Sequence, residues 1–473
     1  MPLPHGFTVR LDRHTRVVDG GRALLGGFPT RLLRLTARAR PLVAGREVRV
    51  AGPASALLAE RLLDAGLADP VAATLPQPAD PRYTFVIPVR DRPRELDRLL
   101  TAIGTGGQVI VVDDASHRPE AVAATAARHG ATLVPLRVNA GPAAARNAGL
   151  RLVTSPYVVF ADSDVVPAPD TVPTLLRHFA DPRVAMAVPR ITALATRGSA
   201  TWIGRYENAR SSLDLGAHPA AVRPGSPVSW APTACAVARV DALGEGFDER
   251  MRVGEDVDLC WRLIEGGWRV RYEPAVAAAH DHRVRFHDWF LRKAVYGTGA
   301  HPLAERHPRF IAPAVLAPWS TALLLALLAQ RRWSLPAAAA VFGVTTVRIA
   351  RKLSGTREPY RLALALGLTA HGAVAALAQA SALLTRHWWP LTAVGCVASR
   401  RIRRAAAAAA LTDVVLEYRR DRARLDPLRY GIARRLDDLA YGSGVWLSAL
   451  KGRSTAALRP RFAQAPGRPG PAR

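Results

Sequence analysis

The chain has few cysteines and no apolar leader. Only three cysteines occur in 473 residues, and none belongs to a CxxC pair: Cys235, Cys260 and Cys396. This spacing excludes a disulfide framework and a zinc ribbon, and it is typical of a protein from a reducing compartment. The first residues contain no apolar run of the kind that a secretory signal carries, so we expect no signal peptide.

Lysine is also scarce, although the formal net charge is +27. Only Lys293, Lys352 and Lys451 are lysines, so arginine carries almost all of the positive charge. Arginine binds phosphate in a bidentate manner, and a basic surface also favours anionic lipid. Because the arginines are spread over the whole chain rather than gathered in one aromatic-rich patch, we expect no nucleic-acid partner.

The length allows roughly three domain-sized units. In the first of them, residues 1–78, we expect short strands at 8–11 and 24–27, a helix capped by Thr30, and an amphipathic helix over 54–65 that ends near Gly66. This order predicts a small, winged-helix-like α+β module.

After a Pro-rich linker at 77–81, residues 82–305 alternate between strand and helix patterns. The expected strands are 84–89, 108–112, 132–137 and a strand ending at Asp162, and the expected helices are 94–103, 120–129 and 142–153. Such alternation predicts an α/β fold with a doubly wound, mostly parallel sheet, whose ligands bind beyond the carboxyl ends of the strands. Asp91, Asp114 and Asp162 each follow an expected strand end.

The segment Phe160–Val165 holds two carboxylates, Asp162 and Asp164, just after an apolar strand. Carboxylate oxygens are hard ligands that suit Mg²⁺ or Mn²⁺, and such an ion in turn holds a diphosphate. Both side chains can reach one site only if the backbone turns between them. The alternative is a loop with two solvated aspartates.

The segment 139–149 begins with a Gly–Pro step. Gly141 allows close approach of the backbone to a ligand, Pro142 suits a first helical turn, and Arg146 lies one turn further on. A nucleotide phosphate could therefore bind at this helix start. The alternative is an ordinary capped helix.

A second acidic cluster, Glu255, Asp256 and Asp258, opens a later helix. One of these carboxylates is accounted for by the helix dipole. Three in four residues suggest more, and one of them could accept the proton of an attacking hydroxyl. Further on, the imidazole of His280 could complete a metal site with Asp164 or contact phosphate.

Five ordered segments together resemble the motifs of an inverting family-2 glycosyltransferase of the GT-A fold: 86–92, 111–116, 139–147, 161–164 and 254–261. The resemblance covers residues 83 to 285. It implies that Asp91 and Asp114 contact the uridine of a nucleotide-sugar donor, with Asp114 at the base. It also implies that Asp162 faces the ribose, Asp164 binds the divalent metal, and Asp256 is the catalytic base.

Further candidates surround these residues. On the donor side we expect Pro88, Asp113, Gly141 and Arg146 beside the aspartates above, with His280 as a second metal ligand. Acceptor-side candidates are Trp230, Glu255, Asp258 and Trp261.

The order of small module, transferase domain and apolar, Arg-rich C-terminal region is similar to the glycosyltransferases of the mycofactocin system. That resemblance implies transfer of a hexose, glucose, to a peptide-derived redox-cofactor precursor, with an α-linked donor giving a β-linked product. The N-terminal module also looks like small peptide-recognition elements, which suggests contact with the acceptor or with a pathway protein.

Two other classes compete with this function. A membrane-bound family-2 transferase would use the same donor site with a lipid-linked or polysaccharide acceptor. The Gln–x–x–Arg–Trp signature of processive synthases has only a compressed counterpart here, at Gln330–Trp333. A non-catalytic sugar- or nucleic-acid-binding protein would leave the ordered carboxylates unexplained.

The C-terminal region changes composition again. Residues 306–404 include the charge-free stretch 311–330, long enough to cross a bilayer, and a second apolar stretch at 362–385. With the basic cluster Arg400–Arg404 these stretches predict association with the cell membrane, the catalytic domain being on the cytoplasmic side. The alternative is a soluble, cytoplasmic protein with buried helices. Residues 405–473 read as amphipathic helices followed, from Arg453, by a disordered tail.

Overall fold

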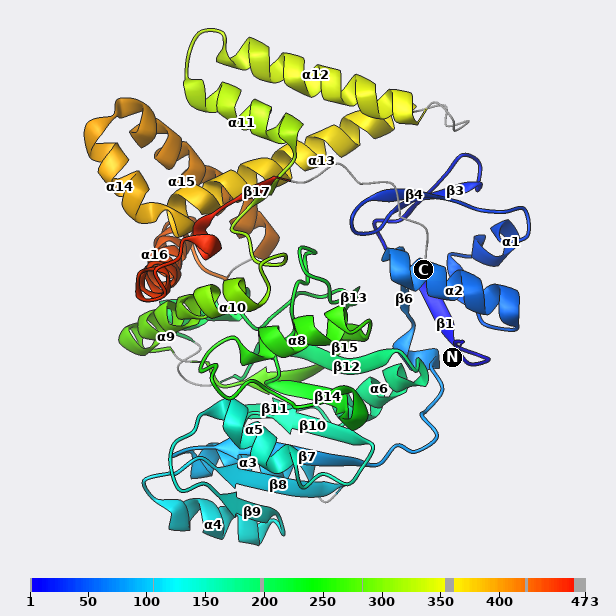
Figure 1. The fold of residues 1–473 in the computed structure, drawn as a ribbon, viewed down its shortest axis with the longest axis vertical. Helices are drawn as coiled ribbons and strands as arrows, with labels where there is room; N and C mark the ends of the chain where they lie inside the picture. Colours follow the sequence, from blue (N-terminus) through cyan, green and yellow to red (C-terminus); the bar gives the residue numbers. More distant parts are fainter. Residues whose placement is uncertain are drawn as a thin grey trace. The chain divides into compact units, whose positions relative to one another are not determined.

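The computed structural model of the protein (Figure 1) describes residues 2–104, 106–195, 200–282, 284–353, 361–421 and 424–462. The chain divides into two compact units, Met1–Val284 and Arg285–Arg473. Each unit is described by itself.

The first unit begins with a small module made of two three-stranded antiparallel sheets and one long helix. The first sheet has the order β5 (Glu47–Arg49), β1 (Thr8–Leu11), β6 (Ala68–Pro70), and the second has the order β2 (Arg16–Val18), β3 (Ala23–Gly26), β4 (Arg31–Arg34). Its helices are α1 (Arg40–Val43), α2 (Pro53–Ala65) and the 3₁₀ turn η1 (Ala72–Thr74). Helix α2 ends at Gly66 in the left-handed conformation, as expected of a glycine at a helix end.

The helix expected after Thr30 is wrong, because residues 31–34 form strand β4. Leu32 and Leu33 pair with Leu25 and Leu24 of β3, so hairpin pairing overrides the local leucine pattern. The prediction of a winged-helix-like module is not confirmed.

The transferase part of the first unit is built on a nine-stranded sheet. Along the sheet the order is β11, β15, β12, β14, β10, β7, β8, β9, with β13 paired to β15. The strands are β7 (Tyr83–Val89), β8 (Gln108–Asp113), β9 (Thr132–Pro135), β10 (Tyr157–Ala161), β11 (Val165–Pro167), β12 (Val184–Ala193), β13 (Ala220–Ala221), β14 (Cys235–Arg239) and β15 (Arg269–His280). The helices are α3 (Pro93–Ile103), α4 (Pro119–Arg128), α5 (Pro142–Leu150), α6 (Thr171–Arg177), α7 (Trp202–Arg210) and α8 (Glu255–Glu265), with short 3₁₀ turns η2 (His178–Ala180) and η4 (Val240–Ala242).

The expected parallel order holds only for one half of this sheet. Strands β10, β7, β8 and β9 are parallel neighbours. Beyond β10 the sheet is mixed, because β14 runs antiparallel to both β10 and β12, and β11 is antiparallel to β15. The prediction of a mostly parallel sheet is therefore corrected to a mixed one.

Helices cover both faces of the parallel half. Val111 of β8 belongs to a core shared with α3, α4 and α6, whereas Ile110 and Val112 pack with α5 on the opposite face. Burial on two faces explains why these strands read as continuous apolar runs rather than alternating ones.

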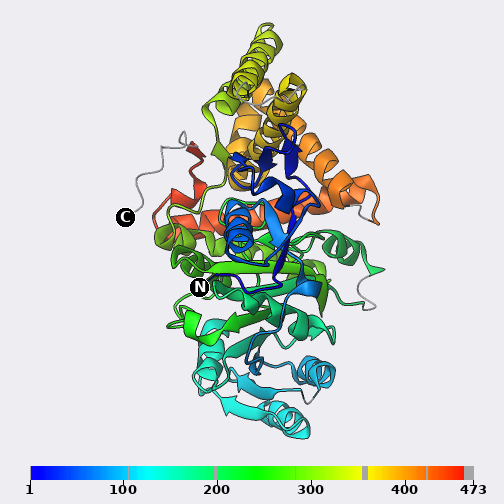
Figure 2. The same cartoon turned by 90° about the vertical axis from the view of Figure 1, so that its right-hand side faces the viewer.

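The N-terminal module is drawn in blue in Figure 2. Arginines of the transferase part bind it. Arg271 of β15 is buried and donates to Asp69 at 2.6 Å. Arg223 donates to the carbonyl oxygens of Leu63 and Asp64, both at 2.7 Å. The module and the transferase part thus share one interface with buried charge.

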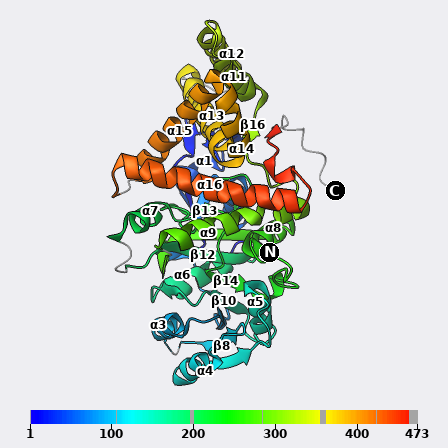
Figure 3. The same cartoon turned by 90° about the vertical axis from the view of Figure 1, so that its left-hand side faces the viewer.

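The second unit is mainly helical. Its elements are α9 (Phe286–Thr298), α10 (Ala300–Arg306), β16 (Val315–Leu316), α11 (Pro318–Ala329), α12 (Ser334–Lys352), α13 (Arg361–Ala382), the π-helical turn η5 (Leu383–His387), α14 (Trp389–Ala398), α15 (Arg400–Asp421), α16 (Pro427–Lys451), the 3₁₀ turn η6 (Ala456–Leu458) and β17 (Arg461–Phe462). Helix α16 runs along α9 (Figure 3), where Gly297 and Gly444 let the two backbones approach closely.

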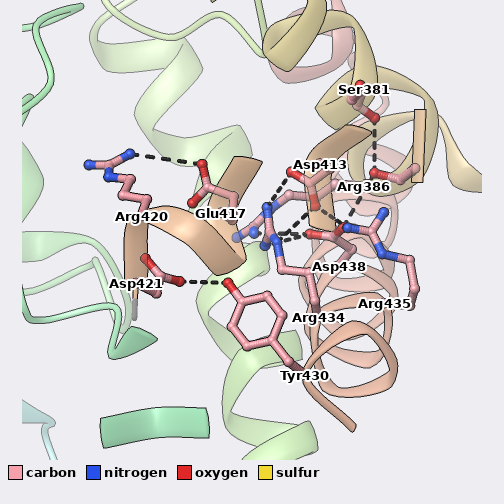
Figure 4. A network of polar contacts seen from close by, with 11 residues as sticks. Ser381, Arg386, Asp413, Glu417, Arg420, Asp421, Tyr430, Arg434, Arg435 and Asp438 are labelled. Atoms are coloured by element: carbon pink, nitrogen blue, oxygen red, sulfur yellow. Dashed lines mark hydrogen bonds and ion pairs between the residues drawn. The ribbon is translucent and has the colours of Figure 1, made fainter. Parts of the chain in front are cut away.

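Buried ion pairs hold α15 against α16. Arg434 bridges Asp413 at 3.0 Å and Asp438 at 3.0 Å, and all three side chains are buried (Figure 4). Arg435 pairs with the same two carboxylates. These ion pairs neutralise the buried carboxylates of Asp413 and Asp438 and join α15 to α16.

The membrane span expected over 311–330 is wrong. Strand β16 interrupts the stretch, and the helix that follows, α11, has only 12 residues. At about 1.5 Å per residue such a helix is about 18 Å long, short of the ~30 Å bilayer core. Among the described residues one helix, Arg361–His387, is long and apolar enough to cross, by length and composition.

The prediction of a disordered tail from Arg453 is wrong for residues 453–462. Residues 453–462 include η6 and strand β17, and β17 pairs in parallel with β16. The remainder of the expected tail, 463–473, lies outside the described residues.

Candidate active site

The two carboxylates after β10 are separated by a tight turn. Val165 N donates to the carbonyl oxygen of Asp162 at 3.1 Å, which is the backbone turn that the sequence required. Asp162 faces Arg146 of α5 at 2.6 Å, whereas Asp164 lies 3.6 Å from Nε2 of His280. The contact with His280 follows from strand register, because His280 pairs with Val165.

Asp164 and His280 form the candidate metal position. Burial alone would raise the pKa of Asp164, but the charges of His280 and Arg92 outweigh it, so the pKa is lowered and the carboxylate stays ionised. The Arg92 guanidinium hydrogen bonds directly to Asp164, which marks a place where positive charge is favourable. No group of three or more metal-ligating side chains occurs in the described ranges. Mg²⁺ is commonly held by one or two carboxylates plus substrate phosphates and waters, so this pair fits such an ion.

Arg146 is the hub of the site. It is 3% exposed and donates to Asp162 on one side and to Glu255 of α8 at 3.0 Å on the other. Its guanidinium also lies 5.3 Å from the centre of the Phe247 ring. Burial disfavours the charged form, yet the two carboxylates more than offset it and raise the pKa of Arg146. Arg146 therefore positions two acids rather than presenting a free charge to solvent.

Asp256 differs from both acidic neighbours. Glu255 pairs with Arg146, and Asp258 is fully buried against Arg262 at 2.8 Å. Asp256 forms no salt bridge within the part of the chain that the structure describes; it accepts a hydrogen bond from Val257 N at 2.8 Å. Burial and the charge of Glu255 raise the pKa of Asp256 to about 7. A carboxylate with this pKa is suited to proton transfer near neutral pH.

The other donor-side candidates lie at the ends of β7 and β8. Asp114 accepts hydrogen bonds from Ala140 N and Gly141 N, at 2.7 and 2.9 Å, and so ties the end of β8 to the start of α5. Gly141 has φ 92°, a left-handed conformation that glycine adopts without strain.

Asp91, which follows β7, and Asp113, the last residue of β8, accept hydrogen bonds from nearby turns. Asp91 is held in a left-handed conformation with φ 58° and accepts bonds from the backbone and ring of His117. Asp113 is buried and accepts two bonds from Ser116, so it shapes the turn after β8. Pro88 lies in β7 opposite Val112 of β8.

The acceptor-side candidates are not equally accessible. Trp261 is 5% exposed, and its ring N–H donates to the carbonyl oxygen of Ser229 at 2.8 Å. This bond fixes the loop that carries Trp230, which is partly exposed. Of the two tryptophans, Trp230 is the more exposed.

Sequence reasoning missed three residues that the structure places in the site. Arg92 contacts Asp164, Asn147 bonds to the backbone of Phe247 in the loop before α8, and Arg252 reaches the carbonyl oxygen of Asn139 at 3.3 Å. Arg92 and Asn147 lay inside the segments that carry the family resemblance, which was the available signal. Arg252 carried none, because its partner is distant in sequence.

Comparisons of the sequence with known proteins identify a family. Residues 84–221 match the family described as Glycosyl transferase family 2, and residues 157–389 match Glycosyl transferase family group 2. Proteins called pre-mycofactocin glycosyltransferase, from two strains of Mycobacterium tuberculosis, are 42% identical over 470 residues, covering 97% of this chain and 98% of theirs. Among solved structures, a mannosyltransferase from Pyrobaculum calidifontis in complex with GDP-Man and Mn²⁺ is 21% identical, with a TM-score of 0.35, and the match covers 72% of this chain and 91% of that one.

Proposed function

Because the chain belongs to the family-2 glycosyltransferases, and within them to the glycosyltransferases of the mycofactocin pathway, we propose that it transfers glucose from a uridine-diphosphate donor with inversion. The acceptor is the peptide-derived mycofactocin precursor, and the product is a β-linked oligosaccharide. The observation that carries the proposal is the charge pattern at α8. Arg146 forms ion pairs with Glu255 and Asp162, whereas Asp256 forms none among the described residues. Burial and the charge of Glu255 raise the pKa of Asp256 to about 7, although the charge of Arg146 acts in the opposite direction.

The donor would lie along the carboxyl ends of β7, β8 and β10. Asp91 and Asp114 would contact the uridine and Asp162 the ribose, while Pro88 and Asp113 shape the strand ends. The first turn of α5 would offer the backbone N–H groups of Ala143 and Ala144 to the diphosphate, because Gly141 N already donates to Asp114 and Pro142 has no N–H. Arg146, which has two counter-ions of its own, would act on the donor through Asp162 rather than by direct contact with phosphate.

Asp164 and His280 would hold a Mg²⁺ or Mn²⁺ ion between them and the donor diphosphate. When bound, such an ion neutralises charge on the departing nucleoside diphosphate. Asp164 supplies an ionised carboxylate at neutral pH, since the pKa of that group is lowered. Arg92, which hydrogen bonds to Asp164, would add positive charge beside the diphosphate.

The reaction would be a single displacement. The acceptor hydroxyl oxygen attacks the anomeric carbon from the face opposite the diphosphate, and the bond from that carbon to the diphosphate oxygen breaks. Asp256 takes the hydroxyl proton. Inversion follows from attack on the opposite face, so an α-linked donor gives a β-linked product.

Two observations support the proposed acceptor: the name of the relatives, pre-mycofactocin glycosyltransferase, and the partly exposed Trp230. An aromatic face of this kind packs against a sugar ring or an apolar side chain. The N-terminal module, with its exposed strand edges, would engage the acceptor or a pathway protein. The enzyme would work on the cytoplasmic side of the cell membrane, where nucleotide sugars are made.

The test is transfer of radiolabelled glucose from UDP-glucose in the presence of Mg²⁺ or Mn²⁺. Purified wild-type protein should glycosylate the peptide-derived precursor, and nuclear magnetic resonance of the product should show a β-linkage. An α-linked product would contradict inversion. Transfer only to a polyprenyl phosphate would contradict the acceptor and leave the donor site intact.

A further inference from the structure

Helix α14 in the C-terminal unit is apolar, yet the protein leaves much of its surface exposed. None of its ten residues is buried. Leu391, Val394 and Val397 are 60%, 72% and 86% exposed, and their spacing of three residues places them along one side of the helix. A large apolar stripe of this kind usually meets another surface.

The layer formed by α11, α12 and α13 continues this pattern. In Figure 1 the α11–α12 pair lies against α13, and these three helices contact one another. Each of them exposes large apolar side chains: Leu325 on α11, Leu335 and Val344 on α12, and Leu362 and Leu366 on α13. Their exposure ranges from 50% to 73%.

The charged residues of this region are almost all basic. Residues 306–412 contain thirteen arginines and one lysine but a single acid, Glu358. Basic residues lie at both ends of α12, with Arg331 and Arg332 before it and Arg348, Arg351 and Lys352 in its last turns. Another exposed group, Arg400, Arg401 and Arg404, follows α14 directly. Apolar faces bordered by arginine match an anionic lipid surface.

The helices next to this layer, α15 and α16, differ from it because they bury ionised side chains. Helices α15 and α16 bury ionised groups, Asp413, Asp438 and Arg434, in one network (Figure 4). Such groups are costly at membrane depth. Lipid contact is therefore confined to α11–α14.

We propose that α11, α12, α13 and α14 bind the headgroup region of an anionic bilayer from one side without crossing it. At about 1.5 Å per residue, α11 is about 18 Å long and α14 about 15 Å, whereas the bilayer core is ~30 Å thick. Among the described residues only the helix over Arg361–His387 is long and apolar enough to cross. Its last turn is tied to the buried ionised network, because Thr385 and Arg386 each donate to Asp438 at 3.3 Å, which keeps that end of the helix out of the bilayer core. This deepens the proposed location at the cytoplasmic membrane surface, and lipid binding can be measured without transferase activity.

The experiment is sedimentation of the purified full-length protein with preformed vesicles. Vesicles of phosphatidylcholine with 30% phosphatidylglycerol should bind the wild-type protein at least about tenfold more strongly than phosphatidylcholine alone, since each arginine near an anionic surface contributes about 1 kcal/mol. The triple variant Leu391→Ser, Val394→Ser, Val397→Ser should weaken binding at least tenfold. Its matched control removes three exposed apolar side chains of the first unit, Val17→Ser, Leu57→Ser and Leu152→Ser, and should bind as wild type.

A second pair of variants tests the charges. Arg400→Gln, Arg401→Gln and Arg404→Gln together should weaken binding to anionic vesicles about 10²-fold at about 1 kcal/mol each. Arg403 is kept because it caps α14 by donating to the carbonyl oxygen of Cys396 at 2.6 Å. The matched control replaces three exposed arginines of the N-terminal module, Arg16→Gln, Arg38→Gln and Arg61→Gln.

Three outcomes would overturn the proposal. One is wild-type protein that stays in the supernatant with both vesicle types. Another is protein that associates with lipid only after detergent reconstitution, which would favour a spanning helix. The third is an α14 triple variant that binds vesicles normally but changes from dimer to monomer by light scattering, which would assign the face to a second copy of the chain.

Discussion

At the scale of single residues, the acids at the start of α8 differ in their partners rather than in their position. Asp256→Asn keeps the shape and removes the proton acceptor. We expect kcat to fall by about 10²-fold or more, while the Kd for UDP by calorimetry stays unchanged. Glu255→Gln is the comparison variant. A crippled Glu255→Gln beside a mildly affected Asp256→Asn would assign the base to Glu255.

The pH dependence follows from the same carboxylate. The pKa of Asp256 is raised to about 7, so the ionised base is lost as the pH falls through this value. We expect kcat/KM to rise with pH and to level off above about 7. Glu255→Gln removes the neighbouring like charge and frees Arg146, so both effects should move the acid limb to lower pH. Glu120→Gln, an exposed residue of α4, should leave the profile in place.

The metal position gives a third prediction. Asp164→Ala should abolish transfer and weaken Mn²⁺ binding measured by calorimetry in the presence of UDP, while circular dichroism stays native. Asp170→Ala, an exposed aspartate six residues further along, is the matched control. Full activity of Asp164→Ala, or of the wild-type enzyme in excess chelator, would count against a metal at this place.

At the scale of elements, the loop between β9 and α5 depends on one side chain of β8. Asp114→Ala leaves Ala140 N and Gly141 N without their acceptor, at roughly 1–3 kcal/mol for each buried group. We expect a lower unfolding free energy in urea and a higher KM for the donor. Asp114→Asn retains one acceptor oxygen, so its unfolding free energy and donor KM should lie between those of the wild type and of Asp114→Ala. Unchanged donor KM in both variants would exclude a role for this loop in donor binding.

Contacts between α5 and the segment around α8 position the candidate base. Arg146 on α5 holds Glu255 on α8, and Asn147 holds the loop that leads to α8. These contacts join segments about 100 residues apart in sequence. The base is therefore positioned by packing between elements rather than by its own helix.

At the scale of the whole molecule, the N-terminal module cannot be removed without consequence for the sheet. Arg271→Met would leave Asp69 buried without a counter-ion; burial is already the main cause that raises the pKa of Asp69. Breaking a buried pair in this way costs about 3–5 kcal/mol, which should appear as a large drop in Tm. The double variant Arg271→Met, Asp69→Asn should recover part of that loss. A single variant with the stability of wild type would show that the interface is not needed for folding.

Deletion of residues 1–76 separates the two roles considered for the module. Loss of transfer to the peptide-derived acceptor, with donor binding and slow donor hydrolysis retained, would support recognition of the acceptor. Aggregation would favour a structural cap, in line with the buried Arg271–Asp69 pair. Unchanged kinetics toward the natural acceptor would rule recognition out.

The sequence by itself determined the local order of the transferase part. Apolar runs, Gly–Pro steps and acids after strand ends predicted strands β7, β8, β9 and β10 and helices α3, α4 and α5 to within about three residues, because each is set by local pattern. For Asp162 and Asp164 the same signals left two alternatives open, a shared metal site that requires a backbone turn and a loop with two solvated side chains. They failed at β4, whose leucines were assigned to a helix, and at 311–330, where a strand divides an apolar run.

What only the tertiary structure decided is how distant segments meet. Three features depend on contacts across long stretches of chain: the mixed half of the sheet, the pairing of Arg92 with Asp164, and the partners of the three acids of α8. Of these acids, Glu255 pairs with Arg146 and Asp258 with Arg262, whereas Asp256 forms no salt bridge among the described residues. Composition cannot distinguish Asp256 from Glu255, since both open the same helix. Their difference arises because Arg146 reaches one carboxylate and not the other, and burial then raises the pKa of the one left without a partner.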